Sequence, residues 1–162
     1  MTAADWLEVA RITIEPKDYC FLITRGESGH ANARLVQPFK PEEDFTIWFG
    51  TSPRSRKVRE ITANDQVTVT YENAADHAYV TLQGRAQVER DVDARHKYWR
   101  VEWARFWPAG PGDEDYVLIR FIPSRIELMS IYRNVVPDPR LQPAVLVREG
   151  EEWVVAENDV DK

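Results

Sequence analysis

The residues best suited to chemistry lie together between positions 51 and 57. This segment (TSPRSRK) holds three positive charges and three hydroxyl groups. We expect it to follow a strand and begin a helix, with Ser52 as N-cap and Pro53 at the first helical position. A helix N-terminus offers unpaired N–H groups and the positive end of the helix dipole, so basic side chains there call for a compensating anion. The segment therefore predicts a phosphate site. The alternative is a solvated basic face on a short helix.

Arg34 is a second candidate for holding an anion. It lies in an expected strand over 31–38, where alternation points it away from Ala33 and Leu35 and to the same side as Val36. An arginine inside a barrel strand usually has a fixed anionic or aromatic partner, or lies at a wet edge.

No other pattern in the sequence indicates a catalytic group. His30, His77 and His96 are far apart and lack metal-binding spacing such as HExxH, so no metal site is predicted. The single cysteine, Cys20, lies in an apolar strand and is interpreted as a buried structural thiol. GxSxG, Walker and GxGxxG motifs do not occur, and no catalytic residue is assigned.

The charge of the chain argues against two classes of partner. Its 162 residues carry a net charge of −6, whereas nucleic acids and anionic lipids reward positive charge. The opening residues (MTAADWLEVARITIEP) include acids and no long apolar run, so we expect no signal peptide. No stretch approaches the roughly 20 apolar residues of a membrane span. These features predict a cytoplasmic protein without a nucleic-acid or membrane partner.

Nine strands and three helices are expected to position the candidate residues. The helices are expected from the Thr2 cap to Pro16, over 52–63 and over 91–106. The strands are expected over 19–25, 31–38, 45–51, 67–71, 79–88, 116–122, 126–132, 144–147 and 153–156. Gly84 is expected to mark a bulge or a tight corner. Because the helices interrupt the strands rather than alternating with them, the pattern favours an antiparallel barrel with attached helices, in a single domain over 1–162.

The aromatic residues carry two further expectations. Trp99, Trp103 and Phe106 share a face of the third expected helix and should pack against the barrel as core. Six tryptophans and six phenylalanines exceed what one modest core needs, and aromatic side chains are favoured at interfaces, so we expect a homodimer.

Several stretches together resemble the pyridoxamine 5′-phosphate oxidase-like superfamily of flavin-binding split-barrel proteins. They are Ala33–Val36, Ile47–Thr51 with Ser55–Lys57, and Tyr79–Arg85. The loop over 107–113, which leads into 116–120, is similar to the general stress protein branch in particular. The similarity runs from Tyr19 to about Ile131. It implies a mainly β (α+β) fold, an antiparallel split β-barrel with a few peripheral helices.

The resemblance also implies a homodimer that binds FMN between its subunits. Arg56 and Lys57 would hold the phosphate, and either Trp48 or an aromatic residue of the partner chain would cover a face of the flavin ring. The full set of implied cofactor-binding residues is Arg34, Leu35, Val36, Trp48, Gly50, Thr51, Ser55, Arg56, Lys57 and Tyr79.

Two departures from the vitamin B6 phosphate oxidases bear on the reaction. Tyr79 stands where those enzymes have a glutamine, and residues 155–158 (VAEN) lack their Arg-x-His pair. We therefore expect not pyridoxine phosphate oxidation but an FMN-dependent oxidoreductase or flavin reductase. It would act on a small molecule with a donor such as a reduced nicotinamide. The alternatives are a non-catalytic flavin-binding stress protein, or an enzyme using deazaflavin F420, whose longer anionic tail would draw on Arg54 and Arg59.

Overall fold

The computed structural model describes residues 1–135 and 141–156, so Glu157 and Asn158 of the C-terminal departure lie outside the described residues. The helices are α1 (Ala3–Ile14), α2 (Arg56–Ala63) and α3 (Val92–Lys97), with 3-10 turns η1 (Ala74–Asp76), η2 (Val101–Arg105) and η3 (Gly110–Gly112). The strands are β1 (Cys20–Arg25), β2 (Ala31–Val36), β3 (Ile47–Thr51), β4 (Gln66–Asn73), β5 (Ala78–Glu89), β6 (Val117–Ser130), β7 (Ala144–Glu149) and β8 (Glu152–Val155). None of the helices in these two ranges is long and apolar enough to span a bilayer.

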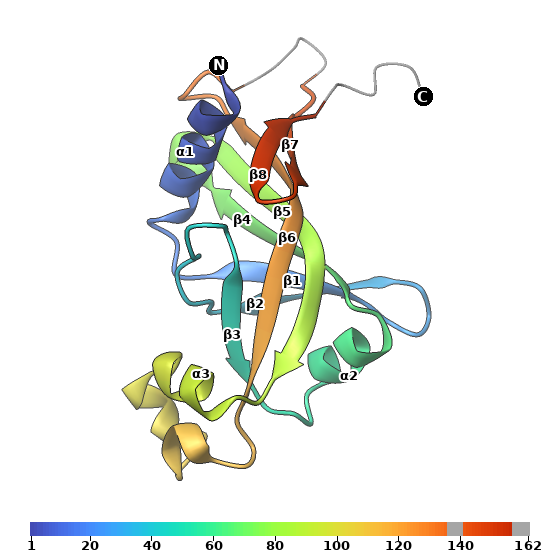
Figure 1. Ribbon diagram of the computed structural model, residues 1–162, viewed down its shortest axis with the longest axis vertical. Coiled ribbons are helices and arrows are strands. Elements are labelled where there is room, and N and C mark those ends of the chain that lie inside the picture. The colour runs from blue at the N-terminus through green and yellow to red at the C-terminus, as the bar shows by residue number, and fades with distance from the viewer. Residues whose placement is uncertain (136–140, 157–162) are drawn as a thin grey trace.

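The eight strands of the described residues form one antiparallel sheet that curls into a split barrel (Figure 1). Their order is β2-β1-β4-β5-β6-β7-β8, and β3 pairs with the first half of β6 while β7 pairs with its second half. Strands β5 and β6 have 12 and 14 residues, long enough to run through both halves of the barrel. The expectation of a mainly β split barrel with a few peripheral helices is confirmed.

The bend in the two long strands lies at Gly84, where a bulge was expected. The β5–β6 register shifts between Gln83 and Gly84, and Gly84 stands opposite Pro123. A Cβ at Gly84 would overlap the backbone of Ile122, so only glycine allows this close approach. The prediction of separate strands over 116–122 and 126–132 is wrong, because β6 continues through Pro123. Proline lacks an N–H group, and a bulge is where a strand tolerates that loss.

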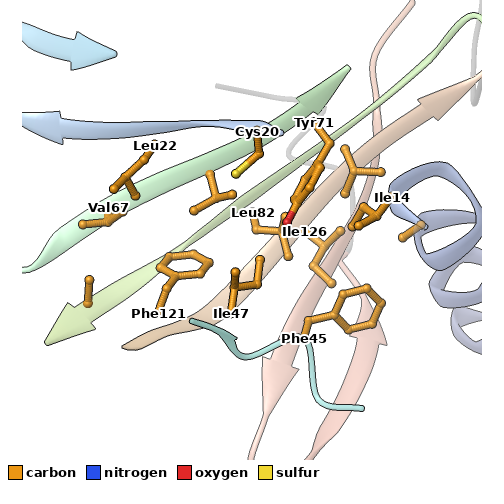
Figure 2. Close-up of a cluster of buried hydrophobic side chains, with 14 of the residues drawn as sticks. Ile14, Cys20, Leu22, Phe45, Ile47, Val67, Tyr71, Leu82, Phe121 and Ile126 are labelled. Carbon is orange, nitrogen blue, oxygen red and sulfur yellow. The ribbon is translucent and has the colours of Figure 1, made fainter. Parts of the chain in front are cut away.

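The inner faces of the strands enclose the main hydrophobic core (Figure 2). Side chains from β1, β3, β4, β5 and β6 meet there, and α1 adds apolar residues at one end of the barrel. Figure 2 labels ten of these residues: Ile14, Cys20, Leu22, Phe45, Ile47, Val67, Tyr71, Leu82, Phe121 and Ile126.

Two sequence predictions at the N-terminal end are confirmed. Thr2 and Asp5 form the expected capping box of α1. Cys20 lies buried in the core beside Tyr71, and burial raises the pKa of its thiol to about 12.

The second helix begins later than the sequence predicts. Its N-cap is Ser55, whose hydroxyl accepts a hydrogen bond from the Val58 N–H, and not Ser52. The Ser52 hydroxyl instead donates to the Asp115 carboxylate at 3.0 Å, while the Ser55 N–H donates to the Ser52 carbonyl oxygen. The Ser52 oxygen also accepts from the Arg54 N–H at 3.3 Å, so residues 52–55 form a turn that precedes the helix.

The expected helix over 91–106 is also wrong as a single element. It is divided into α3 and η2 by Tyr98–Arg100, where Arg100 has extended backbone. The Tyr98 hydroxyl donates to the Glu42 carboxylate at 2.6 Å, and Tyr98 is the C-cap residue at which α3 ends. Trp103 is buried as expected, but Phe106 is 59% exposed and does not belong to the core.

Candidate functional site

Two arginines, one from β2 and one from α2, pair with a buried carboxylate, Glu60, and a lysine of α2 lies beside one of them. Arg34 lies on the inner face of β2, opposite Leu22 of β1, as strand alternation predicts. Arg56 and Glu60 are one turn apart on α2, and Arg56 Nε lies 3.1 Å from Glu60 Oε1. Arg34 Nη2 lies 3.8 Å from Glu60 Oε2. Packing of α2 beside β1 and β2 thus brings Arg34 and Arg56 to opposite oxygens of one carboxylate. We call Arg34, Arg56, Lys57 and Glu60 the cation cluster.

The carboxylate of Glu60 is held firmly in place. Glu60 is only 6% exposed. Thr24 Oγ1 donates to Oε2 at 2.7 Å, and Asn32 Nδ2 lies 3.1 and 3.2 Å from the two oxygens. The hydrogen bond from Thr24, together with the bond from Asn32 and the two arginines, lowers the pKa of Glu60 despite its burial. Glu60 is therefore a fixed negative charge at neutral pH.

One terminal nitrogen of the Arg34 guanidinium makes hydrogen bonds and the other makes none. Nη1 donates to Thr24 Oγ1 at 2.7 Å and to the Leu22 carbonyl oxygen at 3.3 Å. Nη2 is buried but has no hydrogen-bond partner within the described ranges. Burial lowers the pKa of Arg34, and the neighbouring charge of Arg56 acts in the same direction. A buried cationic donor without a partner is costly, and an anion oxygen would satisfy it.

Lys57 adds a third positive charge beside Arg34. Burial lowers the pKa of Lys57, and the charge of Arg34 lowers it further. Three cations and one carboxylate leave the cluster with a net charge of +2. Next to it lies a hollow of about 370 Å³, whose lining includes Arg25, Arg56 and Arg59. Of the cluster, Arg56 and Glu60 line this hollow, whereas Arg34 and Lys57 do not, so the open space lies on the Arg56 side of the cluster.

The hydroxyls and Arg54 of the 51–57 segment are used within the protein. Thr51 Oγ1 donates to Ser55 Oγ at 3.3 Å, which joins the end of β3 to the start of α2. Arg54 forms a 2.9 Å ion pair with Asp115 and lies apart from the cation cluster. The segment thus divides, with Arg56 and Lys57 entering the cluster and Ser52 and Arg54 bound to Asp115.

Trp48 and Gly50, two expected cofactor residues, lie in a second apolar cluster beneath α3. Trp48 is 8% exposed, stacks on Tyr98 with ring centroids 4.7 Å apart, and donates its indole N–H to Glu42 at 2.9 Å. Trp48 is therefore a packed core residue with one ring face already covered. A Cβ at Gly50 would overlap the Trp103 ring, so this glycine is explained by packing. The aromatic cluster consists of Trp48, Tyr98, Trp103, Tyr116 and Leu118, with Phe39, Trp99 and Trp107 against it.

The remaining expected residues lie beside the cation cluster or on the outer face of the sheet. Val36 packs partly buried against the main core, whereas Leu35 points outward and is 59% exposed. Phe21 is directly opposite Leu35 and is also exposed. Tyr79 lies on the same outer face, in β5, where it pairs with Met129. Within one chain, Tyr79 is therefore separated from the cation cluster by the sheet.

Sequence reasoning missed the residues that organise the cluster, namely Glu60, Thr24 and Asn32. The only available signal was the spacing of Arg56 and Glu60, four residues apart on a helix. That spacing also occurs in countless exposed ion pairs. What distinguishes this pair is the burial of Glu60 and its hydrogen bonds to Thr24 of β1 and Asn32 of β2, which a one-dimensional pattern does not contain.

Three solved structures share the fold. General Stress Protein 26 from Bacillus anthracis is 26% identical, with a TM-score of 0.66, covering 75% of this chain and 92% of that one. A protein related to general stress protein 26 from Clostridium acetobutylicum is 18% identical, with a TM-score of 0.70 and coverage of 82% and 92%. A pyridoxamine 5′-phosphate oxidase-related, FMN-binding protein from Nostoc punctiforme is 14% identical, with a TM-score of 0.68 and coverage of 93% and 92%. None of the curated proteins matches the sequence.

The family model described as pyridoxamine 5′-phosphate oxidase like matches residues 8–129. This range extends from α1 to the second half of β6 and includes β2, α2 and every member of the cation cluster. The chain therefore belongs to the pyridoxamine 5′-phosphate oxidase-like family.

Proposed function

We propose that this protein binds FMN at the cation cluster and acts, as a homodimer, as an FMN-dependent oxidoreductase on a small molecule. The observation that carries the proposal is the cluster of net charge +2 formed by Arg34, Arg56, Lys57 and Glu60, in which the buried Nη2 of Arg34 makes no hydrogen bond. A phosphate monoester carries a charge of about −1.5 to −2 at neutral pH and accepts charge-assisted hydrogen bonds from such donors. The related protein from Nostoc punctiforme is described as FMN-binding.

The backbone of β2 offers a second set of contacts for the flavin. β2 is at the end of the strand order, so one side of its backbone has no strand partner within the described residues. Free N–H and C=O groups on an edge strand are ready to pair with a planar polar group. We propose that the polar edge of the flavin ring meets the backbone near Leu35 and Val36, next to the phosphate-binding Arg34.

Bound FMN would supply hydride and electron transfer. The residues of the chain have the supporting tasks. Arg34, Arg56 and Lys57 would bind the phosphate, and the exposed Leu35 would lie against apolar parts of the cofactor or of a second subunit.

A second copy of the chain is the proposed partner for the outer face of the sheet. Tyr19, Phe21 and Leu35 expose 53%, 43% and 59% of their surface there, directly beside the β2 segment proposed to bind FMN. Exposed aromatic and aliphatic side chains that adjoin a functional site are typical of an interface. A second subunit on this face would also explain how Tyr79, on the outer side of β5, could belong to a flavin site.

The structure favours FMN over the deazaflavin F420. The F420 alternative depended on Arg54 and Arg59 as additional ligands for a longer anionic tail. Arg54 is neutralised by its ion pair with Asp115 at 2.9 Å. Of these two arginines, Arg59 alone lies beside the cluster, where Arg25 also lines the hollow, and this set suits a single phosphate better than an extended polyanion.

The proposal is tested with the purified full chain. Reconstitution with FMN should give about one tightly bound flavin per chain and a visible absorption spectrum. Addition of reduced nicotinamide with an artificial electron acceptor should then give steady-state turnover. Bound FMN without turnover would favour the non-catalytic flavin-binding alternative, and absence of bound flavin would refute the proposal.

A further inference from the structure

We infer that Glu60 is a positioning residue for the cofactor phosphate: its carboxylate fixes the guanidinium groups of Arg34 and Arg56 so that their remaining N–H groups are available to one anion. This inference rests on the proposed FMN site. Glu60 does not touch the anion in this scheme and acts only through the two arginines.

Both carboxylate oxygens of Glu60 are fully used inside the protein. Oε2 accepts from Thr24 and Asn32 and faces Arg34 Nη2, while Oε1 accepts from Asn32 and faces Arg56 Nε. A carboxylate in this state has little capacity left for a ligand. Its physical effect is therefore to hold the groups around it.

The two arginines are held through different nitrogens. Arg34 is fixed through Nη1 by Thr24 and Leu22, which leaves Nη2, 3.8 Å from Glu60 Oε2, as a buried donor without a hydrogen bond. Arg56 is held by Glu60 through Nε, so the pairing uses the inner part of its guanidinium. Thr24 joins the two halves of the network, because its hydroxyl accepts from Arg34 and donates to Glu60.

Plain electrostatics predicts the opposite outcome to positioning. A carboxylate 3.1 and 3.8 Å from two cations weakens the attraction that those cations exert on an anion. If charge alone mattered, removing the charge of Glu60 would strengthen FMN binding. If Glu60 positions the arginines, removing its charge loosens both guanidinium groups, and FMN binding weakens. The sign of the change therefore distinguishes the two effects.

The test compares FMN with riboflavin, which has the same ring and no phosphate. We expect Glu60→Gln to weaken FMN roughly 10- to 100-fold, equivalent to the loss of about one charged hydrogen bond, while riboflavin changes less than about threefold. Dissociation constants are measured by quenching of flavin fluorescence. Unchanged or tighter FMN binding, or equal losses for the two flavins, would overturn the inference. Glu8→Gln, on the exposed side of α1, makes the same change in net charge away from the cluster and should leave both affinities unchanged.

A second variant and a second probe keep the result interpretable. Glu60→Asp keeps the charge but shortens the side chain. Positioning therefore predicts weaker FMN binding, whereas a pure charge effect predicts no change in FMN affinity. If Glu60→Gln does not fold, Asn32→Ala replaces it: this change removes only a donor that fixes Glu60, and an unaltered ratio of FMN to riboflavin affinity would refute the inference.

Inorganic phosphate tests the same arginines without flavin. It should protect the wild type against thermal unfolding, and this protection should be smaller in Glu60→Asp. A wild type that binds phosphate but no flavin would refute the proposed function alone. Equal protection in both proteins would refute the role of Glu60 alone.

Discussion

The ring of Trp103 occupies the space that a Cβ atom on Gly50 would need. A Cβ built there would also lie 2.9 Å from the Tyr116 ring. Gly50 lies in β3 and Trp103 lies in η2, so this contact packs η2 against the barrel.

We therefore expect Gly50→Ala to destabilise the protein by about 1–3 kcal/mol, because the added methyl group overpacks the aromatic cluster. Chemical denaturation measures this change. Gly112→Ala is the matched control, since nothing lies within 4 Å of a Cβ there. A loss of FMN affinity without a change in stability would instead indicate that Gly50 contacts the cofactor.

Two aromatic residues near η2 should differ sharply in their effect on stability. Trp103 is buried, and Trp103→Ala should cost about 3–5 kcal/mol in the free energy of unfolding. Phe106 is 59% exposed, and Phe106→Ala should cost less than about 1 kcal/mol. Thermal and urea unfolding of the two variants check the contrast. Similar costs for the two variants would support the sequence prediction that both residues pack against the barrel on one face.

Replacing Arg56 and Lys57 together by Ala should weaken FMN by about two to four orders of magnitude, because two charged hydrogen bonds to phosphate are lost. The helix should remain, since the Ser55 cap is untouched and Ala is a good helix former. Riboflavin affinity should change far less. Arg133→Ala, an exposed arginine that follows β6, is the control, and a comparable loss of FMN affinity there would indicate a diffuse basic surface.

Phe21→Asp should convert a dimer into a monomer, because it places a charge on the outer face of the sheet opposite Leu35. Sedimentation velocity at micromolar concentration measures the oligomeric state. Val101→Asp alters an exposed apolar residue elsewhere and should leave the dimer intact. A wild type that sediments as a monomer would refute the proposed interface.

The stabilising effect of Glu60 should depend on pH in a defined direction. Its hydrogen bonds and nearby arginines lower the pKa of Glu60 in the folded state below the unfolded value of about 4.3. The stability that it contributes is therefore present above about pH 4.3 and is lost as the pH falls through the lower folded value. The difference in unfolding free energy between wild type and Glu60→Gln should be constant from pH 6 to 8 and shrink below about pH 4. A difference that grows on acidification would contradict this pKa assignment.

Short-range patterns predicted the parts of the fold that depend on neighbouring residues. Alternation in β2 placed Arg34 on the inner face, and Gly84 marked the bulge. The errors arise where a distant residue competes. Asp115 binds the Ser52 hydroxyl and the Arg54 side chain in the turn before α2, and Glu42 binds Tyr98 where the third helix was expected to continue. Neither partner can be identified from local sequence, because more than 50 residues separate each pair.

The same reasoning applies to the candidate site. Arg56 and Lys57 were predicted as phosphate ligands because cations at a helix start are locally unusual. Glu60 was not, because its importance comes from burial beneath β1 and β2 and from its contacts with Thr24 and Asn32. Trp48 was assigned to the flavin on resemblance, whereas in the structure it lies in an aromatic cluster assembled from β3, β6 and the segment after α3.

The reactivity of the Cys20 thiol provides a measure of how often the barrel opens. It is the only cysteine of the chain, and burial beside Tyr71 raises its pKa to about 12. Thiol reagents react with the thiolate, so the native state should be almost inert to them at neutral pH. Labelling of Cys20 then proceeds only when β1 separates from the core, and its rate reports how often the barrel opens under fully native conditions. Comparison of that rate with and without flavin would measure how much a bound cofactor slows the opening.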